Sequence, residues 1–326
     1  MTVQALSRYI LMLAMALIMA GIIVKVKALW GGRYGAPLLQ PVFDIIRLFK
    51  KSQVVSEAAS DVFKAGPSIA LASVLAAALP VPISSGAALI SFKGDFVFFV
   101  CALAAGRFFT LISALDTGGS FSGMGAGRMI TLSALIEPAF FIIIATLAQL
   151  TGKSSFSEIY AVIPTPVTDT VQSGFFWSFV ELAQIWSDSY LLIPAICGNI
   201  VLLMFILAEA GRVPVSDPAT LNEPAMITGA LTLEVSGPDL AFMTLASFLR
   251  ISILGTLITG IIVPAWVSPV TSLILYMFIM FAIAATIGLL ESVFARFRLT
   301  HVPQFLFGAT GIALIVLAVL TIGVNK

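Results

Sequence analysis

Four acidic side chains lie within or at the ends of long apolar stretches of the sequence. They are Glu137 within Met129–Leu150, Glu209 at the close of Leu191–Ala210, Glu291 near the end of Leu273–Phe294, and Asp116 after Phe96–Leu115. A carboxylate at the centre of a bilayer costs roughly 2.5 kcal/mol or more, so such residues indicate a function by default. Several of them in one small membrane protein indicate a polar path that moves charge, most simply protons.

Two arginines, Arg107 and Arg250, also lie inside apolar stretches and are candidate partners of Glu137 and Glu209. A carboxyl group holds its proton more tightly when it is desolvated and less tightly when an arginine is near, so a pair of the two is a tunable station for protons. Arg128 precedes Glu137 by nine residues on one expected span, which is too far along a helix for direct contact. The alternative for the arginines is snorkelling to the membrane surface.

Other acids fall in the hydrophilic stretch 211–239, where a solvated surface charge is the alternative. This stretch contains Arg212, Asp217, Glu223, Glu234 and Asp239. Its prolines predict several short elements rather than one helix. Asp116 also has a structural alternative, because the Asp-Thr-Gly sequence that it begins suits a turn that ends a helix.

The composition is that of a membrane protein rather than a soluble one. Of the 326 residues, 60% are hydrophobic and 10% are charged, against about 25% charged in soluble domains. The net charge of +1 gives no indication of nucleic-acid binding. Cys101, Cys197 and the single His301 form no ligand cluster, so neither a metal nor an iron–sulfur site is expected in this chain. For GMGAG at 123–127 we expect a tight turn and close helix packing, because no strand precedes it as in a nucleotide loop.

Apolar stretches of about 20 residues, the length that crosses a bilayer, predict an all-α chain with eight transmembrane helices in one domain, residues 1–326. The expected spans are Ser7–Val26, Pro67–Ile90, Phe96–Leu115, Met129–Leu150, Tyr190–Ala210, Leu240–Val263, Val270–Phe294 and Gln304–Val324. Pro80 and Pro82 interrupt the second span, so its last turns are expected to unwind. The first span is too long for the apolar core of a signal peptide, so we expect it to be retained.

The distribution of Lys and Arg predicts the orientation of the chain. Most of them lie in the first loop, about 27–66, and in the loops on the same side, which include 211–239. The long loop 151–189 lies on the opposite side. Because cytoplasmic loops are enriched in Lys and Arg, we expect the first loop in the cytoplasm and both termini outside, in the plasma membrane.

Within the first loop, the segment Pro41–Lys51 predicts a short amphipathic helix at the membrane interface. Phe43, Ile46 and Phe49 recur at helical spacing, with basic side chains beside them. The alternative is a solvated basic face.

Four segments together resemble one protein family. They are GGRYGAPLLQPVFDIIRLFKK (Gly31–Lys51), AGRFFTLISALDTGGSFSGMGAGR (Ala105–Arg128), LIEP (Leu135–Pro138) and AEAGRVPVSDPATLNEPAMITGALTLEVSGPDLAF (Ala208–Phe242). The chain resembles the eight-span membrane subunit beside the quinone chamber of respiratory complex I, and the homologous subunit of group 4 energy-converting hydrogenases such as formate hydrogenlyase. LDTG followed by GAGR looks more like the hydrogenase branch.

The resemblance implies a membrane-arm subunit of a ferredoxin-linked oxidoreductase, which docks a peripheral iron–sulfur arm and couples electron transfer to proton or ion translocation. It implies no catalytic or redox centre in this chain, iron–sulfur clusters or NiFe in hydrogenase-like partner subunits, and antiporter-like membrane neighbours. Residue by residue, it places the proton path on Glu137, Glu209, Glu223, Glu234 and Glu291, with Arg212 as a charge partner. From their positions we add Asp116 to the path, Arg107, Arg128 and Arg250 as charge partners, and Arg33, Gln40, Asp44, Arg47, Asp217 and Asp239 for docking.

Two other classes of function fit parts of the pattern. A stand-alone proton-coupled secondary transporter would suit the embedded acids and the interrupted second span, but the sequence has no internal repeat and its cytoplasmic loops are large. A passive membrane anchor would contain the same acids simply as partners of the arginines.

Overall fold

The computed structural model of the chain describes residues 3–56, 58–83, 87–162, 192–216, 227–263, 267–295, 297 and 301–324. Within these residues all regular secondary structure is helical, which confirms the expected all-α class. The helices are α1 (Val3–Trp30), α2 (Gln40–Phe49), α3 (Asp61–Ala78), α4 (Asp95–Asp116), α5 (Ser120–Thr151), α6 (Phe156–Val162), α8 (Leu192–Glu209), α9 (Thr228–Leu231), α10 (Gly237–Ile262), α11 (Pro269–Val293) and α12 (Val302–Val324). The expected site residues Asp217 and Glu223 lie outside the described residues.

Six of these helices, α1, α3, α4, α5, α10 and α11, are long and apolar enough to cross a membrane. α8 and α12 coincide with the other two expected spans, but their described apolar stretches, Ile196–Glu209 and Val302–Ala318, are shorter. The chain is therefore a multi-pass membrane protein, and the described residues support six crossings by length and composition rather than all eight.

α3 differs in position from the expected second span, Pro67–Ile90. It begins at Asp61 and ends at Ala78, ahead of Pro80 and Pro82. The side chain of Ser60 caps its start by accepting a hydrogen bond of 3.2 Å from the backbone N–H of Val62. The two prolines that follow Leu79 cannot donate the backbone hydrogen bonds of a further turn, which accounts for the early end.

α5 also begins earlier than expected, at Ser120 instead of Met129. The prediction of a tight turn at 123–127 was therefore wrong, and the turn lies at Gly118, whose φ of +66° favours glycine. The prediction of close helix packing holds at Gly125, because a Cβ atom there would lie 2.5 Å from Cβ of Ala230 in α9.

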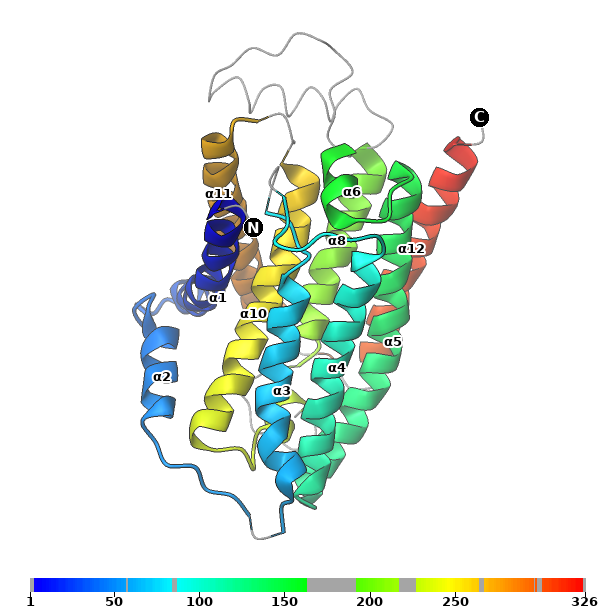
Figure 1. The fold of residues 1–326 in the computed structure, drawn as a ribbon. Coiled ribbons are helices and arrows are strands. Elements are labelled where there is room, and N and C mark those ends of the chain that lie inside the picture. Colours follow the sequence, from blue (N-terminus) through cyan, green and yellow to red (C-terminus); the bar gives the residue numbers. More distant parts are fainter. Residues whose placement is uncertain are drawn as a thin grey trace.

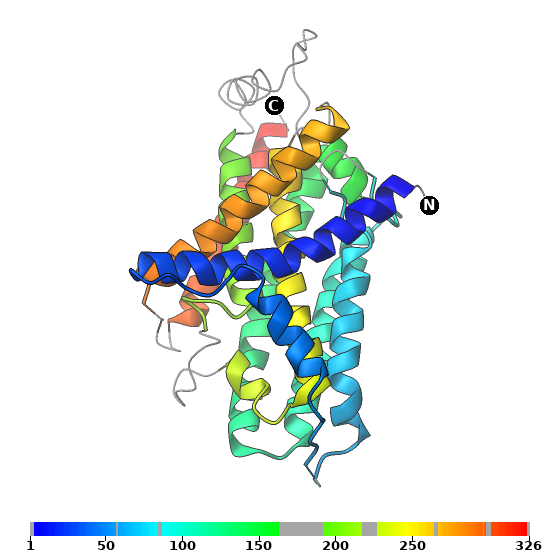
Figure 2. The same cartoon turned by 90° about the vertical axis from the view of Figure 1, so that its left-hand side faces the viewer.

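The helices form a bundle around α10. α3, α4, α5 and α10 run side by side along the molecule, and α8 and α12 pack behind them (Figure 1). α1 crosses the bundle at a steep angle and packs on α10 and α11 (Figure 2). In the most apolar 18-residue stretch of α10, 78% is buried inside the chain, whereas the corresponding stretches of the other five helices are 39–44% buried. Side chains on α10 therefore face protein on nearly every side.

α2 lies beside the bundle, where the chain turns back after α1 (Figure 1). The backbone of Leu38 passes so close to α1 that a Cβ atom at Gly21 would lie 1.9 Å from the Leu38 carbonyl oxygen. Phe49 packs edge-on against Phe242 of α10, with ring centroids 5.5 Å apart. Phe43 and Ile46 of α2 remain exposed.

Candidate functional site

Two of the acids and two of the arginines expected to form a site meet in the middle of the bundle. The four side chains come from four helices: Arg107 from α4, Glu137 from α5, Glu209 from α8 and Arg250 from α10. We call this set the mid-span cluster. Helices that are distant in sequence thus bring together charges that periodicity alone could not pair.

Arg107 joins the two acids of the mid-span cluster. One terminal nitrogen of its guanidinium donates to Oε1 of Glu137 at 3.0 Å, and the other donates to Oε2 of Glu209. Nε of Arg250 lies 3.6 Å from Oε1 of Glu209. The cluster contains two positive and two negative groups, so its charges balance within the bundle.

Burial differs sharply within the mid-span cluster. The side chains of Arg107 and Glu209 are each 4% exposed, and that of Arg250 is 11% exposed. The side chain of Glu137 is 36% exposed. Because removing one partner of a buried ion pair leaves an uncompensated charge, the cluster must remain paired or change protonation when its geometry changes.

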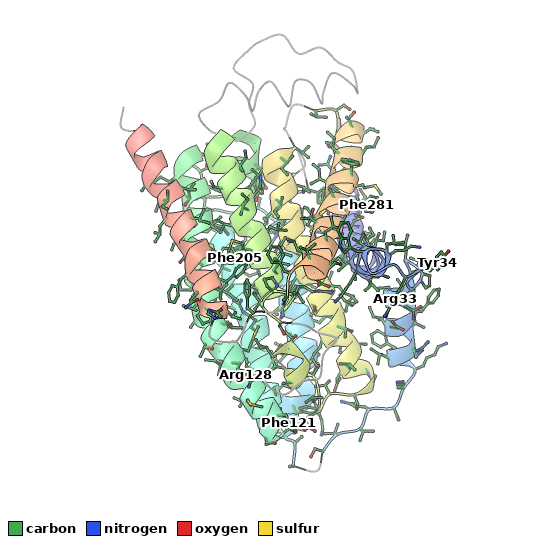
Figure 3. The ribbon with its side chains drawn as sticks, turned by 180° about the vertical axis from the view of Figure 1, so that it is seen from behind. Arg33, Tyr34, Phe121, Arg128, Phe205 and Phe281 are labelled. Atoms are coloured by element: carbon green, nitrogen blue, oxygen red, sulfur yellow. The ribbon has the colours of Figure 1, made fainter. Side chains whose placement is uncertain are left out.

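A small pocket adjoins the mid-span cluster, with room for about one water molecule. Arg107, Glu137 and Glu209 line it, together with apolar side chains that include Phe140 and Phe205. Phe205 lies within the bundle on α8 (Figure 3). Among the described residues, Nε of Arg107, Oε1 of Glu209 and Nε of Arg250 are buried without a hydrogen-bond partner. The site therefore combines proton-binding groups, unused hydrogen-bonding capacity and space on the scale of water.

A second charged cluster, the edge cluster, lies where α1 and α11 end. Glu291 is buried there between Arg212, whose nitrogen is 3.3 Å from Oε1, and Lys27, whose Nζ is 3.5 Å from Oε2. Arg212 follows Glu209 by one helical turn of sequence, so the edge cluster is connected to the mid-span cluster by a short piece of chain. Sequence reasoning did not single out Lys27, which lies in the last turn of α1.

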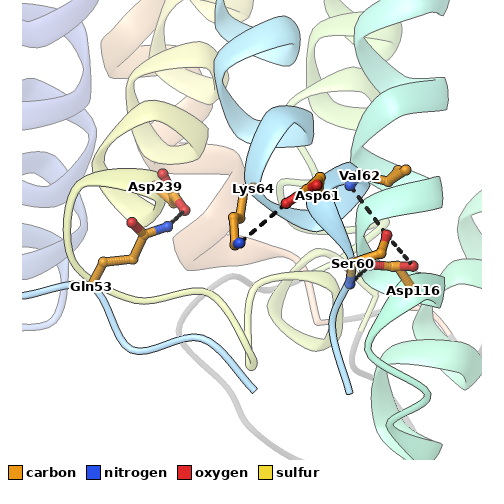
Figure 4. Close-up of polar contacts among 7 residues, drawn as sticks. All are labelled: Gln53, Ser60, Asp61, Val62, Lys64, Asp116 and Asp239. Atoms are coloured by element: carbon orange, nitrogen blue, oxygen red, sulfur yellow. Dashed lines mark hydrogen bonds and ion pairs between the residues drawn. The ribbon is translucent and has the colours of Figure 1, made fainter. Parts of the chain in front are cut away.

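Asp116 and Asp239 make local contacts at another part of the bundle (Figure 4). Asp116 accepts hydrogen bonds from the backbone N–H of Ser60 at 2.7 Å and from its hydroxyl at 2.9 Å, so it ties the end of α4 to the start of α3. The buried Asp239, in the first turn of α10, accepts from the side-chain amide of Gln53. Both contacts join separate segments of the chain, so they favour a structural role, which is the alternative interpretation given above for Asp116.

The remaining expected residues lie apart from both clusters. Glu234 is exposed and lies beside Gly119 at the start of α5. Arg128 donates to Sδ of Met124 at 3.1 Å on the surface of α5 (Figure 3).

Arg33 is exposed at the turn between α1 and α2 (Figure 3). On α2, the side-chain amide of Gln40 donates to Asp44 at 2.9 Å, and Arg47 lies 4.0 Å from the same carboxylate.

Asp95 is a fully buried acid that sequence reasoning missed. Its carboxylate accepts hydrogen bonds from the hydroxyl of Ser155 at 2.8 Å and from the backbone N–H of Phe156 at 2.9 Å, where α6 begins. The available signal was an acid at the first position of an apolar helix, directly after Gly94. In the part of the chain that the structure describes, no three His, Cys, Asp or Glu side chains are grouped to hold a metal ion.

Comparisons with known proteins agree over nearly the whole chain. The family model described as NADH dehydrogenase matches residues 3–322. Formate hydrogenlyase subunit 4 of Escherichia coli (strain K12) is 28% identical over 312 residues, which cover 93% of this chain and 94% of that protein. An NADH-quinone oxidoreductase subunit of Rubrobacter xylanophilus is 25% identical over 261 residues, covering 78% of this chain and 72% of that protein.

Two further proteins are similar to this chain, one over part of its sequence and one in its fold. Hydrogenase-4 component C of E. coli is 28% identical over 195 residues, and this chain spans 62% of its length. A chain from the structure of a membrane-bound sulfane sulfur reductase, described as an archaeal respiratory membrane complex, superposes with a TM-score of 0.77 at 20% identity and covers 97% of this chain and 98% of that one. At that identity the likeness shows a shared fold.

Proposed function

The chain belongs to the NADH dehydrogenase family, and from that premise we propose that it is a membrane-arm subunit of a complex I-like, ferredoxin-linked oxidoreductase of the membrane-bound hydrogenase type. In this proposal it docks a peripheral iron–sulfur arm and couples electron transfer to the movement of protons or other ions. The relatives named as a formate hydrogenlyase subunit and a hydrogenase-4 component support this class of complex. The chain itself contributes no redox centre.

The mid-span cluster is the observation that carries the proposal. Arginines that served only to neutralise isolated acids would need one partner each, whereas Arg107 is shared by Glu137 and Glu209, and Glu209 is shared by Arg107 and Arg250. A carboxyl group favours its protonated form when a nearby cation withdraws and its charged form when the cation returns. Movement of one shared arginine would therefore change the protonation of two acids together.

The edge cluster offers a way for the peripheral arm to act on the mid-span cluster. Arg212 pairs with Glu291 and is separated by two residues from Glu209. We propose that redox events at the docked arm shift the segment 211–239, and that this shift moves Arg212 and the end of α8 together. The displacement would reach Glu209 first and then Glu137, from which the proton leaves toward an antiporter-like neighbour.

The proposal also includes the arrangement in the membrane. α8 and α12 complete eight spans, and α2 lies at the interface with its exposed Phe43 and Ile46 toward lipid. The basic loops face the cytoplasm of a cell whose plasma membrane contains the complex, with both termini outside. The exposed Arg33, ahead of α2, and the exposed Arg47, on α2, then face the side on which the peripheral arm docks.

The ion pairs themselves favour one rival, a passive anchor whose acids only balance arginines. Replacing Arg107 by methionine and Glu137 by glutamine together would leave Glu209 paired with Arg250, so the net charge of the cluster would stay zero. If this chain were a passive anchor, the complex with this double variant would still move the wild-type number of ions per electron. The relay predicts that this double variant transfers electrons but does not pump, measured with the intact complex in proteoliposomes.

A further inference from the structure

Apolar side chains cover the mid-span cluster on the side that faces α6. Each of the four helices of the cluster has an apolar residue one turn beyond its charged residue, toward the end of the bundle where α6 lies (Figure 1). All four apolar residues also line the pocket beside the cluster, and they are Leu103, Phe140, Phe205 and Leu254. Moving a charge into apolar surroundings without hydrogen-bond partners is costly. A proton held at the cluster therefore meets an apolar layer in this direction.

A continuous series of aromatic rings extends this layer across the bundle. The centroids of neighbouring rings lie 5.6–6.1 Å apart, in the order Phe205, Phe140, Phe99, Phe156 and Tyr160. The five residues come from α8, α5, α4 and α6, and each is at most 5% exposed. The last ring packs against α10, because a Cβ atom at Gly260 would lie 3.0 Å from Cε2 of Tyr160. We call this series the aromatic barrier.

The buried Asp95 holds the α6 end of the aromatic barrier in place. Its carboxylate accepts hydrogen bonds from the Ser155 hydroxyl and from the backbone N–H of Phe156, so it fixes the first turn of α6 on α4. Oγ of Ser91 lies 2.8 Å from Oγ of Ser155 and adds a further link. Asp95 precedes Phe99 by one turn, so both lie on the same face of α4. The contact between Phe99 and Phe156 therefore depends on the position that Asp95 gives to α6.

We propose that the aromatic barrier seals the mid-span cluster against proton leak toward the α6 end of the bundle, and that Asp95 is a positioning residue that keeps this seal closed. The inference rests on the proposed function, in which the cluster exchanges protons and the α6 end faces the outer side. Without a seal, ions moved outward by the complex would return through this subunit, and the work of moving them would be lost.

The first test measures passive proton leak in proteoliposomes that contain the intact complex, without an electron donor. Phe99→Gln and Phe99→Leu both replace the ring with a smaller, unbranched or branched side chain, but only glutamine offers hydrogen bonds to water. We expect an imposed pH gradient to decay about tenfold faster with Phe99→Gln than with the wild type, because the polar group lowers the cost of charge in the barrier. Phe99→Leu should keep the wild-type rate of decay.

Phe63→Gln is the control for destabilisation alone. Phe63 is 1% exposed on α3 and packs with Val235 and Met243 in a separate apolar cluster. A glutamine there buries the same polar group without entering the aromatic barrier, so the pH gradient should decay at the wild-type rate. A wild-type rate of decay with Phe99→Gln, or equal acceleration with Phe63→Gln, would overturn the proposal.

The second test concerns the positioning role and adds no polar group to the aromatic barrier. Asp95→Ala removes the hydrogen bonds to α6, whereas Asp95→Asn retains a carbonyl oxygen that can accept from the backbone N–H of Phe156. We expect faster decay of the pH gradient with Asp95→Ala and the wild-type rate with Asp95→Asn. Equal rates of decay in these two variants would contradict the role assigned to Asp95.

Both tests measure leak in the absence of electron transfer, so their results are separable from those on the relay. Faster decay with Phe99→Gln together with full pumping by Glu137→Gln would keep the barrier and remove the relay. Wild-type decay with Phe99→Gln together with a loss of pumping by Glu137→Gln would remove the barrier and keep the relay.

Discussion

Arg107 holds the two acids of the mid-span cluster, and its side chain is almost fully buried. Replacing it with alanine leaves Glu209 with Arg250 alone and Glu137 without a cation. We expect Arg107→Ala to lower the free energy of unfolding by about 3 kcal/mol or more, because an uncompensated charge remains in the bundle. The matched control is Arg47→Ala. It removes a solvent-exposed ion pair in which Arg47 lies 4.0 Å from the Asp44 carboxylate, so it should lower the free energy of unfolding by less than about 1 kcal/mol. The measurement is thermal unfolding in one detergent, and equal shifts in the two variants would contradict the account.

Substitution of Asp116 tests whether this side chain stabilises the fold or belongs to the proton path. Its hydrogen bonds to Ser60 predict that Asp116→Ala and Ser60→Ala each destabilise the chain by about 1–2 kcal/mol and that their effects are not additive. The number of ions moved per electron should stay at the wild-type value in Asp116→Ala. A double-mutant cycle of unfolding free energies is the measurement. Fully additive losses, or a loss of pumping, would return Asp116 to the proton path.

The chemistry of the site could be predicted from sequence further than its geometry could. Charged residues inside apolar stretches identify Glu137, Glu209, Arg107 and Arg250 as a group, because lipid excludes unpaired charge. Which acid meets which arginine depends on the faces that four separate helices turn toward one another, and a single sequence does not contain that information. The edge-cluster member Lys27 was missed because the sequence assigns it to the basic first loop, where a positive charge has an ordinary explanation, whereas the structure places it in the last turn of α1.

At the level of helices, the approach of the Leu38 backbone to α1 makes Gly21 a structural requirement. Gly21→Ala places a methyl group 1.9 Å from the Leu38 carbonyl oxygen, so the segment leading to α2 must move. We expect a loss of about 1–3 kcal/mol of stability. Gly198→Ala of α8 is the control, because no described atom lies within 4 Å of its added methyl group, and it should stabilise the helix by up to about 1 kcal/mol. Equal unfolding midpoints in the two variants would contradict the predicted close approach.

Helix type was easier to predict than helix position. Long apolar runs predicted α4, α8, α10, α11 and α12 to within a few residues. The start of α5 was displaced because Gly123, Gly125 and Gly127 are typical of a turn, yet all three are helical, and Gly125 packs closely against Ala230 of α9. α3 extends through Pro67 toward polar residues, since the Ser60 cap and Asp116 stabilise its first turn. Tertiary contacts of this kind override local propensity and are not visible in a single sequence.

At the scale of the whole molecule, the proposed orientation can be tested with two lysine positions. In a chain with Cys101 and Cys197 replaced by serine, a cysteine is placed at the exposed Lys50 or at the exposed Lys153. The outward position of the α5–α6 loop predicts that an impermeant maleimide labels Lys153→Cys in intact cells. The cytoplasmic position of the first loop predicts that Lys50→Cys is labelled only after permeabilisation. The reverse pattern would invert the topology.

The bundle as a whole encloses a cluster of two positive and two negative side chains, whose members differ in exposure. The side chains of Glu209 and Arg250 are 4% and 11% exposed, whereas the side chain of Glu137 on α5 is 36% exposed. In the proposed relay, this difference in exposure makes Glu137 the member of the cluster from which the proton leaves the subunit.

The most direct test of the relay is the number of ions moved per electron by the intact complex carrying Glu137→Gln, measured in proteoliposomes beside Asp61→Asn, whose carboxylate is 97% exposed. Glutamine keeps the shape and can still accept a hydrogen bond from Arg107, but it cannot take up and release a proton at this position. The account predicts that Glu137→Gln retains part of its electron transfer and moves no ions, while Asp61→Asn matches the wild type. A wild-type number of ions per electron in Glu137→Gln would contradict it.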